Sequence, residues 1–150
     1  MPDVDATADL LTSRPAATAL LADFDGSLAR IVNDPAAAVA MPEALAVLAE
    51  LVQRMGRVAI VSGRPVEFLR RRVPIPGIAL AGLYGLERAF DGERVVDERV
   101  IPYLAGVAAA ADEADAPRPG NLVERKADLA VTLHWRPAGD RAAQVCAVAA

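Results

Sequence analysis

The sequence of 150 residues contains a single cysteine, a single histidine and a single lysine. One cysteine, Cys146, excludes an internal disulfide framework and a cysteine-rich zinc site. One histidine, His134, excludes a metal site built from several imidazoles. A chain without internal disulfides suits a reducing compartment, so we expect a cytoplasmic location.

The sequence also lacks an excess of positive charge and a long apolar segment. Sixteen Lys+Arg against twenty Asp+Glu leave a net charge of −4. Nucleic acids and anionic membranes attract basic surfaces, so neither is expected as a partner. The apolar stretch at residues 15–22 ends at Asp23, far short of the ~20 residues that span a bilayer. The first nine residues are acidic, unlike a signal peptide.

Short apolar runs followed by glycine predict three buried strands, at residues 19–24, 57–62 and 78–81. Two helical patterns separate them, at residues 42–56 and 65–72. Alternation of strand and helix predicts an α/β fold, a doubly wound parallel sheet with right-handed crossovers.

The pattern changes in the second half of the chain. Asp91-Gly92 predicts the turn of a hairpin. An alanine-rich helix is expected at residues 102–116, and a further helix from residue 139. Residues 121–126 and 129–136 predict two antiparallel strands with one face in water.

The strongest chemical signal is the segment Asp23-Phe24-Asp25-Gly26-Ser27 at the end of the first strand. Residues two apart in an extended chain project to the same side, so both carboxylates are expected to face one site. Gly26 permits a sharp turn, after which the amides of residues 25–28 can point at an anion. Ligands of open α/β sheets bind beyond the carboxyl ends of the strands, where this segment lies.

A second signal, Ser62-Gly63-Arg64-Pro65, ends the neighbouring strand and precedes a helix. A hydroxyl beside helix N-terminal amides is a phosphate-binding arrangement. The alternative is a purely structural helix cap, and both roles are compatible with the same serine.

Together these residues resemble a known family. DFDGSL at residues 23–28, VSGRP at 61–65 and GLYGLE at 82–87 resemble the haloacid-dehalogenase-like (HAD) phosphatases, which have a Rossmannoid fold. VERK at 123–126 and LHWR at 133–136 resemble the cap of the trehalose-6-phosphate phosphatase branch. The resemblance implies an N-terminal extension at residues 1–15, half of a HAD core at 16–100 and a partial α+β cap at 101–150.

The resemblance also implies roles for the core residues. Asp23 would be the nucleophile that forms an aspartyl-phosphate, and Asp25 the general acid and base. Mg²⁺ would bind the Asp23 carboxylate and the Asp25 backbone carbonyl. Gly26, Ser27, Ser62, Gly63 and Arg64 would hold the phosphoryl group.

Four cap residues, Glu124, Lys126, His134 and Arg136, would contact the sugar hydroxyls or the phosphate of a small sugar phosphate, trehalose 6-phosphate. The alternative for these residues is an exposed polar sheet face with charges paired across strands.

The resemblance covers only the N-terminal portion of the family. It implies that a catalytic lysine and a second acidic motif lie beyond this sequence, so we expect the 150-residue chain alone to be inactive or nearly so. Two other functions stay open: a non-catalytic truncated protein that binds a sugar phosphate or a partner, and another HAD phosphatase acting on sucrose phosphate or mannosyl phosphoglycerate. An incomplete core is also expected to self-associate or to bind a complementing chain.

Overall fold

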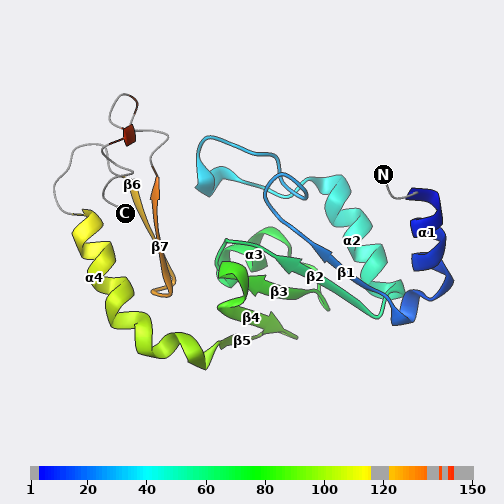
Figure 1. Cartoon of the computed structure of the whole chain (residues 1–150). Coiled ribbons are helices and arrows are strands. Elements are labelled where there is room, and N and C mark those ends of the chain that lie inside the picture. Colours follow the sequence, from blue (N-terminus) through cyan, green and yellow to red (C-terminus); the bar gives the residue numbers. More distant parts are fainter. Residues whose placement is uncertain (1–3, 116–121, 135–138, 140–141, 144–150) are drawn as a thin grey trace. The chain divides into compact units, whose positions relative to one another are not determined.

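The computed structural model describes residues 4–115, 122–134, 139 and 142–143 (Figure 1). The chain divides into two units, Met1–Val95 and Val96–Ala150. The family resemblance implies a boundary nearby, after residue 100. Among the described residues, no helix has the length and apolarity needed to cross a membrane.

The first unit is built on a five-stranded sheet with its strands in sequence order. β1, β2 and β3 are parallel, as predicted, and β4 runs antiparallel to β3. The predicted hairpin joins β4 to β5, and its turn residues Asp91 and Gly92 have φ of 51° and 89°, the positive values of a type I′ turn. The strands are β1 (Ala19–Ala22), β2 (Arg57–Val61), β3 (Ala79–Gly82), β4 (Glu87–Phe90) and β5 (Glu93–Val96).

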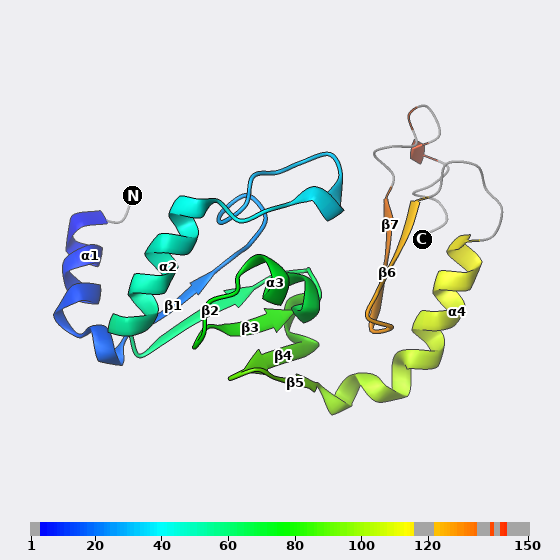
Figure 2. The same ribbon diagram turned by 180° about the vertical axis from the view of Figure 1, so that it is seen from behind.

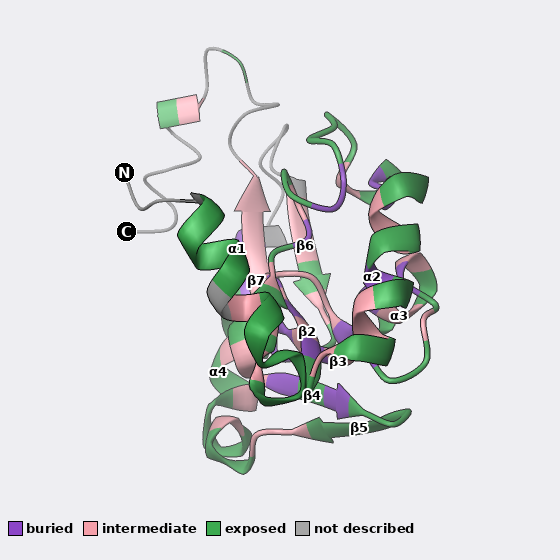
Figure 3. Cartoon of the chain, turned by 90° about the vertical axis from the view of Figure 1, so that its right-hand side faces the viewer, coloured by how far each residue is buried: buried purple, intermediate pink, exposed green. Residues whose placement is uncertain are grey.

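Two helices connect the parallel strands, α2 (Pro42–Arg54) and α3 (Val66–Arg72). Both lie on the same side of the sheet (Figure 3), because successive right-handed crossovers in one direction place their helices on one face. The core lies between these helices and the sheet. On the other face Leu21 is 64% exposed and Phe90 46%. The α/β prediction is confirmed, and α2 and α3 supply one of the two helical layers of a doubly wound sheet.

A helix that the sequence pattern did not predict, α1 (Val4–Ser13), precedes the sheet. It leads into a short 3₁₀ turn, η1 (Pro15–Ala17). The Thr18 hydroxyl donates to the carbonyl of Arg14 at 2.9 Å, which ties the end of this segment to the start of β1. Residues 5–9 and 12–13 of α1 are exposed.

The second unit contains α4 (Leu104–Asp115) and a hairpin of β6 (Leu122–Lys126) and β7 (Ala130–His134). Figures 1 and 2 show α4 beside the two strands, and it packs on both of them. A 3₁₀ segment, η4 (Glu98–Tyr103), precedes α4. The predicted helix and hairpin are present in this unit, whereas the helix expected from residue 139 falls largely outside the described residues.

Gly82 at the end of β3 lies against the backbone that leads into α3. A Cβ atom added there would stand 2.6 Å from the nitrogen of Val66 and 2.8 Å from the carbonyl oxygen of Arg64. Both atoms belong to the backbone, which cannot shift without disturbing α3. We therefore expect Gly82→Ala to lower the free energy of unfolding by about 3 kcal/mol, the upper end of the usual cost of overpacking. A urea-unfolding curve followed by circular dichroism measures the change.

Gly63→Ala is the matched control. Its added Cβ would meet the phenol oxygen of Tyr84 at 2.6 Å, but Tyr84 is 85% exposed and its side chain can swing away. We expect a loss below about 1 kcal/mol, as for substitutions outside a packed core. Equal midpoints for the two variants would show that β3 and α3 are not tightly apposed.

Candidate active site

The ends of two neighbouring strands bring the first candidate residues to one edge of the sheet. β1 and β2 pair in parallel with Ala22 opposite Ile60, so Asp23 and Ser62 both follow the carboxyl ends of their strands. Asp23 is exposed, whereas Ser62 is 2% exposed. The sheet topology therefore creates a site at the edge where α/β proteins bind their ligands.

The loop after Asp23 is closed by its own backbone. Gly26 has a φ of +85°, a conformation that side chains disfavour. Its amide donates to the carbonyl of Ala29 at 2.8 Å, and the amide of Leu28 donates to the carbonyl of Phe24 at 3.0 Å. These two amides are already bonded, so the prediction that the whole run of amides at residues 25–28 points at an anion is wrong for them. Ser27 is exposed within this loop.

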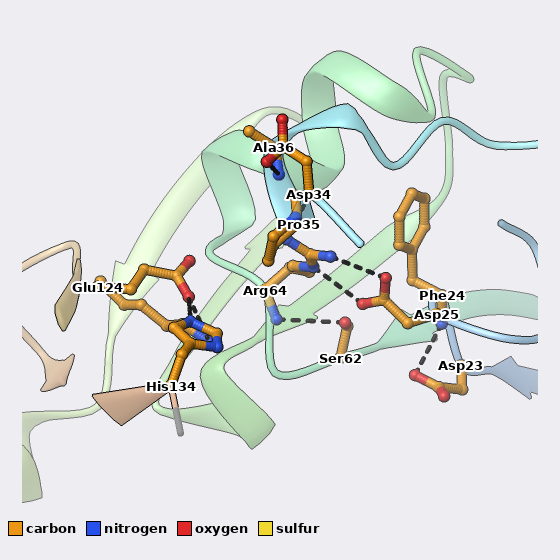
Figure 4. A network of polar contacts seen from close by, with 11 residues as sticks. Asp23, Phe24, Asp25, Asp34, Pro35, Ala36, Ser62, Arg64, Glu124 and His134 are labelled. Atoms are coloured by element: carbon orange, nitrogen blue, oxygen red, sulfur yellow. Dashed lines mark hydrogen bonds and ion pairs between the residues drawn. The ribbon is translucent and has the colours of Figure 1, made fainter. Parts of the chain in front are cut away.

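The two carboxylates have different partners (Figure 4). Oδ1 of Asp23 accepts the backbone N–H of Phe24 at 2.7 Å. Both oxygens of Asp25 accept from the guanidinium of Arg64, from Nε and Nη2 at 2.9 Å each. Paired carboxylates repel each other unless a cation or a proton intervenes, and for Asp25 that cation is Arg64.

The side chain of Arg64 is held on several sides. Its Nη1 donates to the carbonyl of Pro35 at 2.8 Å, and its guanidinium lies 4.7 Å from the centre of the Phe68 ring. Only 12% of this side chain is exposed. A planar guanidinium bound to both oxygens of a carboxylate fixes its orientation. The structure thus shows Arg64 bound to the carboxylate of Asp25. The contact of Arg64 with a phosphoryl group stays a prediction.

Ser62 lies beneath Arg64 in the loop between β2 and α3. Its hydroxyl oxygen accepts the backbone N–H of Arg64 at 3.2 Å, and a hydroxyl that accepts can still donate its own hydrogen. Gly63 is partly exposed beside it. The first amide of α3, on Val66, donates to the side chain of Glu87 at 2.5 Å, so this amide is not available to a phosphate.

Glu87 was not among the predicted site residues. It is fully buried, and its second oxygen accepts from Nε of Arg94 at 2.6 Å. A signal was present in the sequence: strand residues two apart face the same side, and Glu87 is in phase with the buried Ala89. An acidic residue in an inward-facing strand position marks a buried polar contact.

No group of three or more histidine, cysteine, aspartate or glutamate side chains able to hold a metal ion occurs among the described residues. The exposed carboxylate of Asp23 and the backbone carbonyl of Asp25 are oxygen donors of the kind that Mg²⁺ binds. The loop bonds described above leave the Asp25 carbonyl unused. These two donors fit part of a magnesium site.

The second unit brings three further candidates together on one hairpin. Oε2 of Glu124 lies 2.9 Å from Nε2 of His134 and 3.6 Å from Nζ of Lys126. Glu124 is opposite Thr132 in the β6–β7 register, and Leu122 is opposite His134, so the contact is diagonal across the strands. The fourth candidate, Arg136, lies outside the described residues.

Comparison with known proteins identifies the family. The family model described as trehalose-phosphatase matches residues 21–150, which include every candidate site residue. This chain belongs to the trehalose-phosphatase family. The trehalose-phosphate phosphatase of Mycobacterium tuberculosis (strain H37Rv) is 40% identical over 134 residues, which are 86% of this chain and 34% of that protein. The protein of the same name from Mycobacterium marinum is 39% identical over 144 residues, 93% of this chain and 36% of that protein.

Solved structures agree with the family assignment at the level of the fold. The C-terminal domain of the Candida albicans trehalose-6-phosphate phosphatase matches with a TM-score of 0.75 and 24% identity, covering 96% of this chain and 52% of that one. An Aspergillus fumigatus trehalose-6-phosphate phosphatase matches with a TM-score of 0.55 and 27% identity, covering 93% and 56%. The HAD-like fold is confirmed. The chain spans about a third of the length of the curated relatives it matches.

Proposed function

We propose that this chain is the part of a trehalose-6-phosphate phosphatase that carries the nucleophile, the general acid and base, and part of the sugar-binding cap. The observation that carries the proposal is the meeting of Asp23, Ser62 and the Asp25–Arg64 pair at the carboxyl edge of the sheet. Membership of the family supports it.

The proposed reaction has two steps. In the first, a carboxylate oxygen of Asp23 attacks phosphorus and the bond to the sugar oxygen breaks, with Asp25 giving its proton to that oxygen. In the second, water attacks the phosphorus of the aspartyl-phosphate, the bond from phosphorus to the Asp23 oxygen breaks, and phosphate leaves. Asp25 takes the proton that the water loses, and the Asp23 carboxylate is restored. The proton that Asp25 gives in the first step is the one that it takes from water in the second step of the preceding turnover. Between the two steps Asp25 is a carboxylate, the form suited to its contact with Nε and Nη2 of Arg64.

Ser62 and the cap residues bind rather than react. The Ser62 hydroxyl donates to a phosphoryl oxygen, with Gly26, Ser27 and Gly63 lining the phosphoryl position. Mg²⁺, held in part by Asp23 and by the Asp25 carbonyl, would neutralise charge on the phosphoryl group when bound.

The polar cluster on the second hairpin binds the substrate's sugar. Glu124, Lys126 and His134 combine an acceptor with donors within 3.6 Å of it, a set that suits sugar hydroxyls. Arg136 joins them in the proposal. The substrate is a soluble sugar phosphate, and we propose a cytoplasmic location.

Phosphate release from trehalose 6-phosphate in the presence of Mg²⁺ tests the proposal. We expect the 150-residue chain alone to release little or no phosphate, because a magnesium site that lacks ligands loses electrostatic stabilisation of the transition state. The chain joined to the segments of the M. tuberculosis relative that it does not match is expected to be active.

A panel of substrates separates the proposal from the related phosphatases. Preference of the joined protein for sucrose phosphate or mannosyl phosphoglycerate over trehalose 6-phosphate would contradict the substrate. Robust release by the 150-residue chain alone would contradict the expected dependence on the further segments that the M. tuberculosis relative contains.

A further inference from the structure

Glu87 is an ionisable group buried beside the candidate site. It is 0% exposed and belongs to β4, whereas the residues it contacts belong to α3 and β5. A buried carboxylate is costly unless it is paired and hydrogen-bonded. Both of its oxygens have partners, the amide of Val66 at 2.5 Å and Nε of Arg94 at 2.6 Å.

The contact with Val66 supplies what α3 itself lacks. The residue before the helix is Pro65, which makes no side-chain cap hydrogen bond. The first amides of a helix have no partner within the helix and need one from elsewhere. Glu87 provides it from a different strand, and its negative charge is favourable at a helix N-terminus.

The segment from Ser62 to Val66 is thereby fixed to the segment that follows β3. The amide of Leu83 donates to the carbonyl of Arg64 at 3.0 Å, and the amide of Tyr84 donates to the carbonyl of Ser62 at 2.9 Å. Leu83 and Tyr84 have φ of 51° and 57°, a left-handed conformation that costs non-glycine residues about 1 kcal/mol or more each. Such a turn persists only when its surroundings hold it.

Glu87 is the first residue of β4 and lies just after this turn, where its carboxylate binds the start of α3. Two backbone bonds connect the turn to the loop, and the carboxylate connects the start of β4 to the start of α3. The loop between these attachments carries Arg64, whose guanidinium binds both oxygens of Asp25. A shift of the Val66 amide would therefore move the backbone from which Arg64 reaches Asp25.

We propose that Glu87 is a positioning residue of the phosphoryl site: by binding the Val66 amide it sets the backbone of residues 62–66 and so keeps Arg64 on Asp25. This deepens the proposed function, since the residues it positions belong to that site. Glu87 contacts neither substrate nor reacting atoms and acts through the loop.

Two substitutions separate the reach of the side chain from its charge. Glu87→Gln keeps the length of the side chain and an oxygen that can accept from Val66, but loses the charge. Glu87→Asp keeps the charge but withdraws the carboxylate by one carbon–carbon bond, about 1.5 Å, out of reach of Val66. The readout is the NMR signal of the Arg64 Nε–H group in the ¹⁵N-labelled chain, which reports the contact with Asp25 and needs no enzymatic activity.

We expect Glu87→Gln to retain the Arg64 Nε–H signal at its original position. Glu87→Asp is expected to lose or shift it, and to exchange the Val66 amide about tenfold faster or more, the effect of losing a charge-assisted hydrogen bond. Exchange of the β2 amides is expected to stay unchanged in both, which separates a local effect from unfolding. Glu67→Gln, an exposed change on the same helix, is the control and is expected to leave the Arg64 signal unaltered.

The opposite pattern overturns the proposal: an unchanged Arg64 signal in Glu87→Asp, or its loss in Glu87→Gln alone. If the aspartate variant does not fold, hydrogen exchange of the unaltered chain in low urea decides the question. The exchange rates of the Val66 amide and the Arg64 Nε–H are then expected to rise at the same urea concentration, which is lower than the one at which the β2 amides begin to exchange. Different urea dependences for the two groups would contradict the proposal. None of these outcomes depends on whether trehalose 6-phosphate is the substrate.

Discussion

Asp23→Asn is expected to reduce turnover of trehalose 6-phosphate about 10⁴-fold or more in the protein joined to the family's remaining segments, because an amide cannot replace a carboxylate that attacks phosphorus. Asp23 is exposed, and its carboxylate accepts a hydrogen bond from the neighbouring Phe24 amide. Asparagine keeps an oxygen that can accept that bond, so the fold is expected to persist. Steady-state phosphate release measures the loss, and circular dichroism checks the fold.

Two further variants make this result specific. Asp91→Asn is the control: Asp91 is exposed in the β4–β5 turn at a φ of 51°, which asparagine also adopts, and turnover is expected to stay unchanged.

Asp25→Asn is expected to reduce turnover about 10²–10⁴-fold, the usual contribution of a general acid or base. Acid quenching is expected to trap a phosphorylated protein when the joined protein carries Asp23, and none when it carries Asp23→Asn. Turnover by Asp23→Asn, or a phosphorylated protein in its quench, would remove Asp23 from its role.

The strands and helices around the site could be predicted because their signals are local. β1 and β2 are short apolar runs that end at Asp23 and Ser62, and a parallel sheet brings such ends together wherever its register permits. The placement of both residues at one edge follows from this alone. α1 was not predicted, and most of its described side chains are exposed.

The partners of the site's polar groups could not be predicted, since they join residues far apart in the sequence. Arg64 and Asp25 are 39 positions apart, and Glu87 and Val66 are 21 apart. The motif around Arg64 predicts a contact with phosphate, and the fold gives Arg64 a further partner, the carboxylate of Asp25. Likewise, the Val66 amide at the start of α3 binds Glu87, a partner that the motif does not reveal.

The backbone of the loop after Asp23 shows a similar limit. Gly26 was expected to permit a sharp turn, and it does so at a φ of +85°. Which amides that turn leaves open depends on its own hydrogen bonds, and the amides of Gly26 and Leu28 are used to close it. A motif thus indicates a turn, but the donors available to a ligand follow only from coordinates.

Phe24→Ala is expected to lower the free energy of unfolding by about 3–5 kcal/mol, the usual cost of removing a buried phenylalanine. Phe24 is 0% exposed between two aspartates that face the site, and its ring meets the edge or face of Phe68 with centroids 5.8 Å apart and an interplanar angle of 88°. Domains are stable by only about 5–15 kcal/mol, so this loss removes much of the total. Urea unfolding measures it.

Phe90→Ala is the matched control, because Phe90 is 46% exposed and loses less contact when truncated. A smaller loss is expected, near the average of about 1 kcal/mol for single substitutions. Equal losses would show that Phe24 is not the centre of the core.

The effect of Phe24→Ala also extends to the site. Phe68, the partner of Phe24, lies under the Arg64 guanidinium, so a cavity at Phe24 is expected to make the contact of Arg64 with Asp25 less rigid. We therefore expect Phe24 to affect the geometry of the two carboxylates as well as the stability of the fold.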